Sequence, residues 1–237
     1  MGLGWRKISC DRMRAPMGRL CCSRYERLAR QRGFLRIAGI DEVGRGSLFG
    51  PVIAAAVILN PRRRIVGLDD SKKLTAERRK ELAPRIREHA LAWAVAEVDS
   101  ARIDAWNIYQ ASRQAMTAAF EGLKLSPDYL LIDAMHLDIC CEQKSLIHGD
   151  ERSVSIAAAS IVAKVERDRL MEEWDRVFPQ YGLASNKGYG TPDHLEALRA
   201  HGPTTMHRFS FAPVREAKCW ASGATQERLP LAAAAIP

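Results

Sequence analysis

Apolar residues along the chain fall into short continuous runs and alternating stretches, separated by turn-forming residues. Two continuous runs lie at residues 34–41 and 52–59, with the turn Gly44-Arg45-Gly46 between them. Short apolar runs bounded by turn residues are typical of buried strands, and alternation of apolar and polar residues is typical of half-buried strands. The pattern predicts five strands, at residues 34–41, 52–59, 93–98, 129–133 and 145–147.

Other apolar residues recur at three- and four-residue spacing, which is typical of amphipathic helices. Thr75 and Thr191 stand where each could cap the start of such a helix, and Pro192 suits a first helical position. Small side chains at positions 155–163 would let their helix pack very closely against a sheet. The chain is therefore a mixed α/β protein with predicted helices at residues 23–32, 76–89, 107–123, 153–178 and 192–200.

A length of 237 residues suits one large domain, or one domain with an appendage, and the 47% of apolar residues can bury a sizeable core. No apolar run approaches the roughly 18 residues that a membrane-spanning helix needs. Residues 1–30 lack the apolar core of a secretory signal. The six cysteines include no Cys-x-x-Cys, which favours reduced thiols over a zinc site or disulfides. These features predict a cytoplasmic protein with no membrane partner.

The formal net charge of +8 is concentrated near the N-terminus. Residues 1–36 hold ten Lys or Arg and two acids, whereas the remainder of the chain is balanced. We interpret residues 1–23 as a basic arm without ordered structure and residues 216–237 as a poorly ordered tail. Three explanations of the arm stay open: contact with phosphates, a transit peptide, or translation that begins at Met13 or Met17.

Acidic residues stand at the ends of two predicted strands, as Asp41-Glu42 and as Asp133. A further acid, Asp150, precedes the long predicted helix, where the helix dipole favours its ionised form. Converging carboxylates repel one another unless cations lie among them, and oxygen ligands suit Mg²⁺ or Mn²⁺. Two such ions could hydrolyse a phosphodiester. The candidate catalytic and metal-binding residues are Asp41, Glu42, Asp133 and Asp150.

One geometric condition applies to this acid set. Neighbouring residues on a regular strand face opposite ways, so Asp41 and Glu42 can share a site only if the strand ends or bends there. The glycine turn that follows permits such a bend, and its lack of Cβ atoms lets the main chain approach a ligand.

A second glycine loop, at residues 187–192, presents Tyr189. Its ring could stack on a sugar or base, or simply pack at a turn. The run Ser71-Lys72-Lys73 could contact phosphates, or be a solvated loop. The candidate substrate-binding residues are Gly44, Arg45, Gly46, Lys73 and Tyr189.

Simpler explanations hold for other polar residues. Asp41-Glu42 taken alone could be charged residues of an ordinary hairpin. Asp168 stands four residues after Lys164, and an i,i+4 ion pair explains it better than metal binding does. The histidines have no metal-like spacing, so we assign no catalytic role to His148, His194, His201 or His207.

Six segments carry a resemblance to a known family, and they stand in the family's order at plausible spacings. They are GIDEVGRG with GPVIAAAVIL (39–59), DSKKLT (70–75), LLID (130–133), GDERSVSIAAASIVAKVERDRL (149–170), NKGYGTPDHLEAL (186–198) and HRFSFAPV (207–214). On these segments the chain resembles bacterial ribonuclease HII, the type 2 ribonuclease H, over about residues 24–215. The resemblance implies a ribonuclease H-like fold, in which helices flank a mixed β-sheet and a helical C-terminal region follows.

The resemblance also implies roles for individual residues. The family's turn that reads the 2′-hydroxyl falls on Gly44-Arg45-Gly46, and its junction-sensing tyrosine falls on Tyr189. The family's metal-binding acids fall on Asp41, Glu42, Asp133 and Asp150. Its usual residues are replaced, without loss of any acid, at Ser47, Phe49, Ala134 and His148.

The resemblance implies an Mg²⁺- or Mn²⁺-dependent endoribonuclease, and we expect a monomer. Its expected substrates are RNA–DNA hybrids and duplex DNA containing ribonucleotides, cut to leave 5′-phosphate and 3′-hydroxyl ends. The expected cellular roles are ribonucleotide removal and primer clearance in DNA replication. The alternatives are the type 3 enzyme, whose extra N-terminal domain is much longer than this arm, a hybrid-binding protein with impaired catalysis, and a small-molecule phosphatase.

Overall fold

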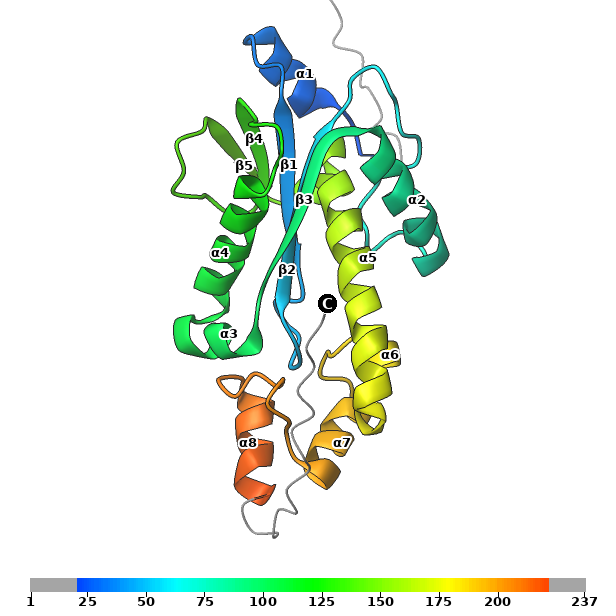
Figure 1. Ribbon diagram of the computed structural model, residues 1–237, viewed down its shortest axis with the longest axis vertical. Helices are drawn as coiled ribbons and strands as arrows, with labels where there is room; N and C mark the ends of the chain where they lie inside the picture. The colour runs from blue at the N-terminus through cyan, green and yellow to red at the C-terminus, as the bar shows by residue number, and fades with distance from the viewer. Residues whose placement is uncertain (1–20, 222–237) are drawn as a thin grey trace, which may run out of the picture.

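The computed structural model describes residues 21–221, which form a central sheet covered by helices and a helical region at one end (Figure 1). Most of the predicted basic arm and of the predicted C-terminal tail lies outside the described residues. The order across the sheet is β3-β2-β1-β4-β5. The strands are β1 (Ile37–Val43), β2 (Val52–Leu59), β3 (Ala90–Val98), β4 (Tyr129–Asp133) and β5 (Gln143–Leu146).

The strand directions make the sheet mixed, as predicted. β1 pairs antiparallel with β2 and parallel with β4, while β4 pairs parallel with β5. β2 and β4 are buried along almost their whole length, because both are continuous apolar runs in the middle of the fold. The C-terminal ends of β1 and β4 therefore lie next to each other, and both carry acids.

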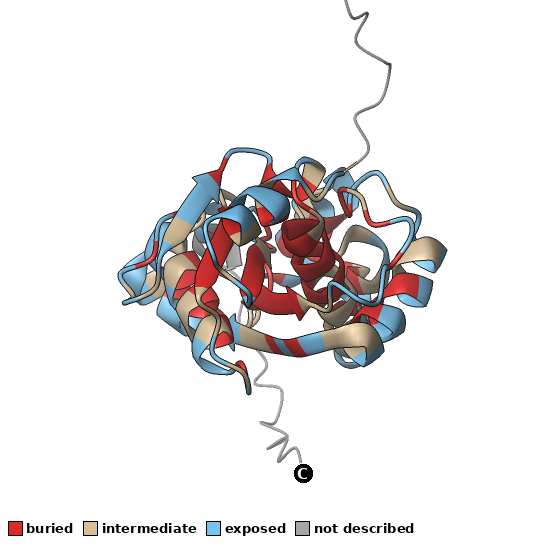
Figure 2. Cartoon of the chain, turned by 90° about the horizontal axis from the view of Figure 1, so that it is seen from above, coloured by how far each residue is buried: buried red, intermediate tan, exposed pale blue. Residues whose placement is uncertain are grey.

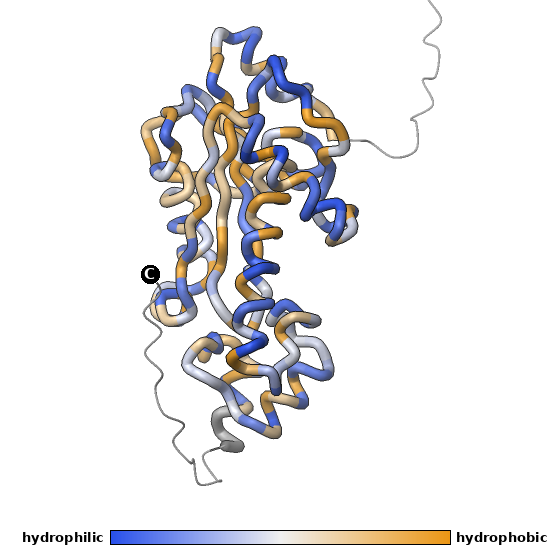
Figure 3. The backbone as a smooth tube through the Cα atoms, turned by 45° about the vertical axis from the view of Figure 1, so that its right-hand side comes forward, coloured by the Kyte–Doolittle hydropathy of each residue, from blue (hydrophilic) through white to orange (hydrophobic). Residues whose placement is uncertain are grey.

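Helices cover both faces of the sheet (Figure 1). Helices α3 and α4 pack on one face, and α2 and α5 pack on the other. Figure 2 shows the buried residues concentrated at the centre of the molecule, and Figure 3 shows hydrophobic residues concentrated in its strands. The helices of this part are α1 (Arg24–Gln31), α2 (Ala76–His89), α3 (Ser100–Trp106), α4 (Ile108–Glu121) and α5 (Val154–Val177).

Helix α5 approaches the sheet as closely as its small side chains predict. A Cβ added to Gly39 of β1 would lie 2.0 Å from the carbonyl carbon of Ser155 and 2.2 Å from its oxygen. Both distances are far inside van der Waals contact, so glycine is required at this crossing. The alanines at 157–159 are fully buried against the same face.

The helical C-terminal region has its own apolar cluster, and Phe49 from the β1–β2 connection is fully buried in it. The Phe49 ring packs edge-on against Trp174, Phe178 and His207. Phe49, which differs from the residue usual in the resembled family, is thus a core residue that packs the β1–β2 connection against this region. The region's helices are α6 (Leu183–Asn186), α7 (Pro192–His201) and α8 (Ala212–Ala221).

The structure departs from the predicted elements in several places: β1 begins at Ile37, β3 begins at Ala90, and β5 spans Gln143–Leu146. β1 continues to Val43, because residues 41–43 keep pairing with β2. The spacing does not predict α3, which has only seven residues and is capped by Asp99 accepting from the Arg102 N–H. Helix α8 runs to Ala221, past the boundary predicted at residue 216. Within residues 21–221 no helix has the length and apolarity to cross a bilayer.

Candidate active site

Asp41 and Asp133 lie side by side on two parallel strands, where β4 ends and two residues before β1 ends. The register pairs Ile40 with Ile132, and each acid is the next residue along its strand. Adjacent strands run about 4.8 Å apart, which brings the two carboxylates to one place at the end of the sheet. The sequence identifies both acids, and the parallel pairing of β1 with β4 joins them.

Asp133 is oriented by the segment that carries Asp150. The backbone N–H of Gly149 donates a 2.6 Å hydrogen bond to Asp133 Oδ1. A Cβ on Gly149 would lie 2.6 Å from Ile156 Cδ1 and 3.1 Å from the same carboxylate oxygen. A side chain there would therefore push the segment away from the strand. The short 3₁₀ turn η1 (Gly149–Glu151) holds the buried Asp150 beside the other acids.

Asp41 and Glu42 lie on opposite faces of β1, because the strand stays regular beyond them. The bend that would bring both onto one face is absent. Asp41 shares the face of Gly39, which α5 covers. Glu42 Oε1 accepts a 3.3 Å hydrogen bond from Arg45 Nη1, while its Oε2 is buried without a partner among the described residues. Glu42 therefore flanks the site from the other side of the strand.

Burial raises the pKa of both acids on β1. For Asp41 burial is the largest cause, the charges of Glu42 and Asp133 add to it, and the Ser160 hydroxyl opposes it. Burial is also the largest cause of the raised pKa of Glu42, where Arg45 opposes the rise and Asp133 adds to it. Both acids on β1 thus respond to Asp133, although they face opposite ways.

Asp150 meets Lys72, the residue before the predicted phosphate-binding Lys73. Burial, followed by the charge of Asp70, raises the pKa of Asp150 to about 6, while Lys72 lowers it. Lys72 Nζ lies 3.7 Å from Asp150 Oδ2, whereas Lys73 Nζ lies 3.2 Å from Glu151 Oε1. Asp70 Oδ1 accepts from the Lys72 N–H at 2.8 Å, and this turn directs the first lysine to the acids. The sequence does not distinguish the two lysines.

The acid set fits a divalent metal by its donor chemistry, since every donor is a carboxylate oxygen. The Glu42 Oε2 atom is buried without a hydrogen-bond partner among the described residues, and the pKa of Asp41 is raised by burial and then by the charges of Glu42 and Asp133. Within residues 21–221, no group of three or more acid, histidine or cysteine side chains is already arranged to hold a metal ion. Glu42 lies on the other face of β1 from Asp41, so the four carboxylates do not meet at one point. The residues that would hold a metal are Asp41, Glu42, Asp133 and Asp150.

The Gly44-Arg45-Gly46 turn and Tyr189 are neighbours in space, although they are far apart in the sequence. Ser47 forms an antiparallel bridge with Tyr189, and the Leu48 N–H donates to the Gly188 carbonyl at 2.8 Å. A Cβ at Gly46 would meet only Tyr189 Cε1, at 4.0 Å. The fold thus brings the two predicted substrate-binding elements together, with open space over Gly46.

Two buried arginines hold these loops together, and the sequence pattern identifies neither of them. Arg167 of α5 donates to the Lys187 carbonyl and to Ser47 Oγ, each at 2.7 Å. Arg208 donates to the Arg45 carbonyl at 3.0 Å, and burial lowers its pKa to about 9. Both side chains are fully buried. Arg167 lies in the charged half of its helix, where the sequence pattern indicates solvent exposure, so no local signal identifies it.

The simpler explanations given for Asp168 and two histidines are confirmed. Lys164 Nζ donates to Asp168 Oδ1 at 2.7 Å, so the i,i+4 ion pair forms. His194 and His207 are buried with ring nitrogens 3.2 Å apart, and burial is the main cause that lowers the pKa of His207 to about 3. Their partners lie within the helical region, away from the acids.

A mixed sheet with acids at the paired ends of its strands is the architecture of ribonuclease H-like nucleases. Residues 38–214 match the family model described as Ribonuclease HII. The chain belongs to the ribonuclease HII family and is an endoribonuclease.

Similarity to known proteins extends over most of the chain. A ribonuclease HII of Koribacter versatilis (strain Ellin345) is 60% identical over 209 residues, which cover 88% of this chain and 80% of the relative. The ribonuclease HII of Archaeoglobus fulgidus, solved in complex with PCNA, has a TM-score of 0.63 at 30% identity, over 73% of this chain and 94% of that chain. Bst-RNase HIII in complex with Mn²⁺ has a TM-score of 0.61 at 23% identity, over 80% and 71%. The predicted family and fold class are confirmed.

Proposed function

We propose that this endoribonuclease depends on Mg²⁺ or Mn²⁺ and cuts the RNA strand of RNA–DNA hybrids, including single ribonucleotides within duplex DNA. The observation that carries the proposal is the adjacency of Asp41 and Asp133 on the paired strands β1 and β4, with Asp150 joined to Asp133 through Gly149. Hydrolysis leaves a 5′-phosphate and a 3′-hydroxyl, with the cut on the 5′ side of the ribonucleotide.

The four acids are the proposed metal ligands. When bound there, divalent ions supply a Lewis acid that activates water and stabilises the leaving oxygen of a phosphodiester. The Gly149 N–H holds the Asp133 carboxylate in place, and the Asp41 side chain lies on the face of β1 that α5 covers. The Mn²⁺ in the Bst-RNase HIII neighbour supports the choice of metal.

The Gly44-Arg45-Gly46 turn and Tyr189 are the proposed readers of the ribose. RNA differs from DNA at the 2′-hydroxyl, so a protein that distinguishes the two must contact that group. The space over Gly46 supports this role, since only the edge of Tyr189 lies within 4 Å of a Cβ built there. Arg167 lies 5.5 Å from the centroid of the Tyr189 ring and supports it from within the protein.

The proposed partners are RNA–DNA hybrids and duplex DNA containing ribonucleotides, bound by a monomer in the cytoplasm. The proposed cellular roles are ribonucleotide removal and primer clearance during DNA replication. A hybrid-binding protein with impaired catalysis is the alternative. Such a protein has no need of the acids, yet three of the four carry pKa values raised by burial near other carboxylates.

The decisive experiment maps the cut in a labelled DNA duplex that holds one ribonucleotide. With Mg²⁺ or Mn²⁺ we expect one cut on the 5′ side of the ribonucleotide, and none with a chelator. Asp133→Asn should fold and bind but not cut. The matched control Asp138→Asn changes an exposed acid paired with Arg113, and it should cut like the native protein. Native-rate cleavage by Asp133→Asn, or cleavage of an all-DNA duplex, would contradict the proposal.

A further inference from the structure

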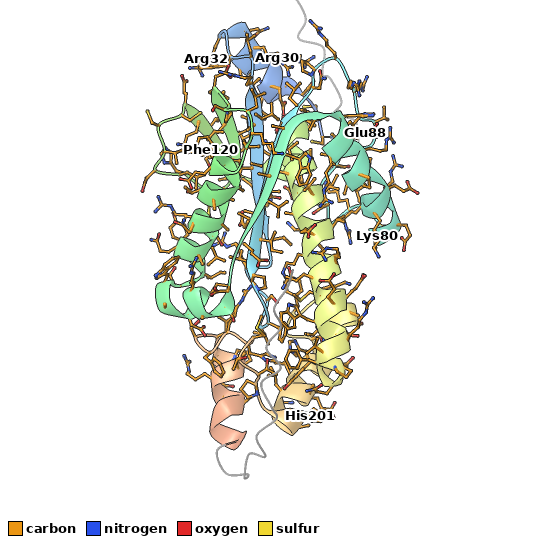
Figure 4. The ribbon with its side chains drawn as sticks, in the orientation of Figure 1. Arg30, Arg32, Lys80, Glu88, Phe120 and His201 are labelled. Atoms are coloured by element: carbon orange, nitrogen blue, oxygen red, sulfur yellow. The ribbon has the colours of Figure 1, made fainter. Side chains whose placement is uncertain are left out.

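A cleft rimmed by arginines lies at the end of the molecule where α1 packs, and the function proposed above gives it no role. It encloses about 670 Å³ between α1, the loop after β2 and the start of α5. Figure 4 places Arg30 at this end, opposite His201. The floor is apolar, and the rim carries four guanidinium groups, from Arg27, Arg30, Arg63 and Arg64.

The positive charge of the rim is not neutralised by acids in the part of the chain that the structure describes. None of the four rim arginines has an ion-pair partner there, in contrast to nearby Arg32 and Arg36, which pair with Glu142 and Asp128. The rim therefore presents four positive charges to one enclosed space.

The one acid that lines the cleft is committed elsewhere. Glu26 Oε1 accepts from Ser153 Oγ at 2.6 Å and from the Ser155 N–H at 3.0 Å, at the start of α5. Glu26 Oε2 is buried and has no hydrogen-bond partner among the described residues. The carboxylate holds the helix in place and leaves the rim cationic.

The loop after β2 is built to display its arginines. Asn60 Oδ1 accepts from the Arg62 N–H at 2.9 Å, and the Asn60 carbonyl accepts from the Arg63 N–H at 3.1 Å. These bonds close a turn in which Arg62, Arg63 and Arg64 are consecutive and exposed. Three adjacent like charges repel one another, and this repulsion is relieved by a polyanion.

The cleft lies a short distance from the acids. Ser155 lines it, and the Ser155 carbonyl packs on Gly39, two residues before Asp41 on the same face of β1. Two strand residues span about 7 Å. The cleft loop also leads directly into the turn that carries Asp70 and Lys72. A strand of duplex advances about 3.4 Å per nucleotide, so the cleft wall at Ser155 lies a few nucleotides from the acids.

We propose that this arginine rim binds backbone phosphates of the substrate duplex on one side of the cleaved bond. The inference rests on the proposed function, to which it adds a second anchoring surface. Guanidinium groups pair with phosphate oxygens through two parallel hydrogen bonds, which suits a rim of four arginines. The rim reads charge and not sequence, so it strengthens binding to any duplex that extends past it.

The test compares Arg63→Gln/Arg64→Gln with the control Arg85→Gln/Arg176→Gln, which changes two exposed, unpaired arginines on α2 and α5. Binding is measured with Asp41→Asn added to every protein, so that the substrate stays intact. The probe is a single-ribonucleotide duplex with long flanks, and two further duplexes have one flank or the other trimmed.

On the long duplex the rim variant should bind roughly tenfold more weakly, and the slope of log K against log salt should fall by about 1.8 for two lost contacts. The control should match the native slope. Trimming the flank that reaches the rim should remove the difference between variant and control, while trimming the other flank should preserve it.

Two results would overturn the inference: a rim variant that keeps the control's slope, or an equal loss of affinity on all three duplexes. Melting temperatures of both variants show whether folding is intact. Cleavage of the same duplex by the native protein tests the proposed function separately. If native protein cuts and the rim variant binds like the control, only the phosphate surface is wrong.

Discussion

The guanidinium of Arg167 lies directly against Gly44, and a Cβ at position 44 would come within 2.2 Å of Arg167 Nε. Gly44 also has a φ of +92°, which residues with a side chain rarely adopt. The same arginine donates to Ser47 Oγ and to the Lys187 carbonyl. One buried side chain therefore supports both the glycine turn and the loop of Tyr189.

Because of this contact, substitutions of the two glycines of the turn should have different effects on stability. Gly44→Ala should lower the free energy of unfolding by about 1–3 kcal/mol and also abolish cleavage, because the new methyl displaces Arg167. Gly46→Ala should keep the native melting temperature, since open space surrounds that position, and lose cleavage through contact with the nucleotide. Urea denaturation and the single-ribonucleotide assay distinguish the two. If both substitutions lowered stability equally, Gly46 would not have the open space described above.

The acid cluster predicts a pH-dependent stability of the metal-free protein. Burial raises the folded-state pKa of Asp150 to about 6, above the unfolded value of about 4. The folded protein therefore binds the proton more tightly, and stability falls as pH rises through the window from about 4 to about 6. Asp150→Asn should flatten this fall, while Asp138→Asn should leave it unchanged. Urea denaturation with a chelator across that window measures it, and an unchanged fall in Asp150→Asn would contradict the assignment.

Metal binding should offset the loss of stability that ionised Asp150 causes in the metal-free protein. At a hundredfold excess over its dissociation constant, a bound ion stabilises the folded state by about 2.7 kcal/mol. Mn²⁺ should therefore raise the melting temperature of the native protein more above the Asp150 pKa than below it. Asp41→Asn should melt higher than the native protein without metal, because it removes a buried charge, and gain little from Mn²⁺. A full Mn²⁺ response in Asp41→Asn would exclude Asp41 as a ligand.

The two lysines of the loop before α2 should differ in function. Lys72 Nζ lies 3.7 Å from Asp150, whereas Lys73 pairs with Glu151 at the surface. We expect Lys72→Ala to slow cleavage more than tenfold and Lys73→Ala less than threefold, because a loss of 1.4 kcal/mol in the transition state corresponds to about tenfold. Single-turnover rates on one substrate give the comparison directly. A larger loss of cleavage rate in Lys73→Ala than in Lys72→Ala would instead support Lys73 as the substrate-binding lysine, as the sequence predicts.

Tyr189 should matter most at an isolated ribonucleotide. Stacking on a nucleotide contributes about 1–3 kcal/mol, so Tyr189→Ala should slow cleavage there by roughly tenfold to a hundredfold. A long hybrid offers many registers and should be affected less. Tyr109→Ala is the matched control, since Tyr109 is exposed on α4. Equal loss on both substrates would argue against junction sensing.

Ala134, directly after Asp133, has a φ of +48° and is exposed. The left-handed conformation costs alanine roughly 1 kcal/mol or more, and glycine adopts it freely. Ala134→Gly should therefore stabilise the protein by about 0.5–1 kcal/mol and leave cleavage unchanged. Ala200→Gly, at an exposed helical position of α7, should destabilise it by about 1 kcal/mol. Denaturation of both variants checks the sign, and a loss of stability in Ala134→Gly would contradict the prediction.

The sequence by itself determined the local elements and the identity of the acids. Helix α2 begins and ends where Thr75 and the helical spacing predict, because capping and periodicity act between residues a few positions apart. The strand end at Asp133 follows from where its apolar run stops, whereas β1 continues two residues past Asp41. The family follows from segments whose order and spacing are written in the chain.

Only the tertiary structure decided which of these residues meet. The parallel pairing of β1 with β4 brings Asp41 to Asp133, and the regular course of β1 turns Glu42 to the other face. The burial of Arg167 under Gly44 has no local signature, since its helical neighbours are charged. Such contacts join segments that are far apart in the chain. They depend on how whole elements pack, which periodicity and capping within one segment do not encode.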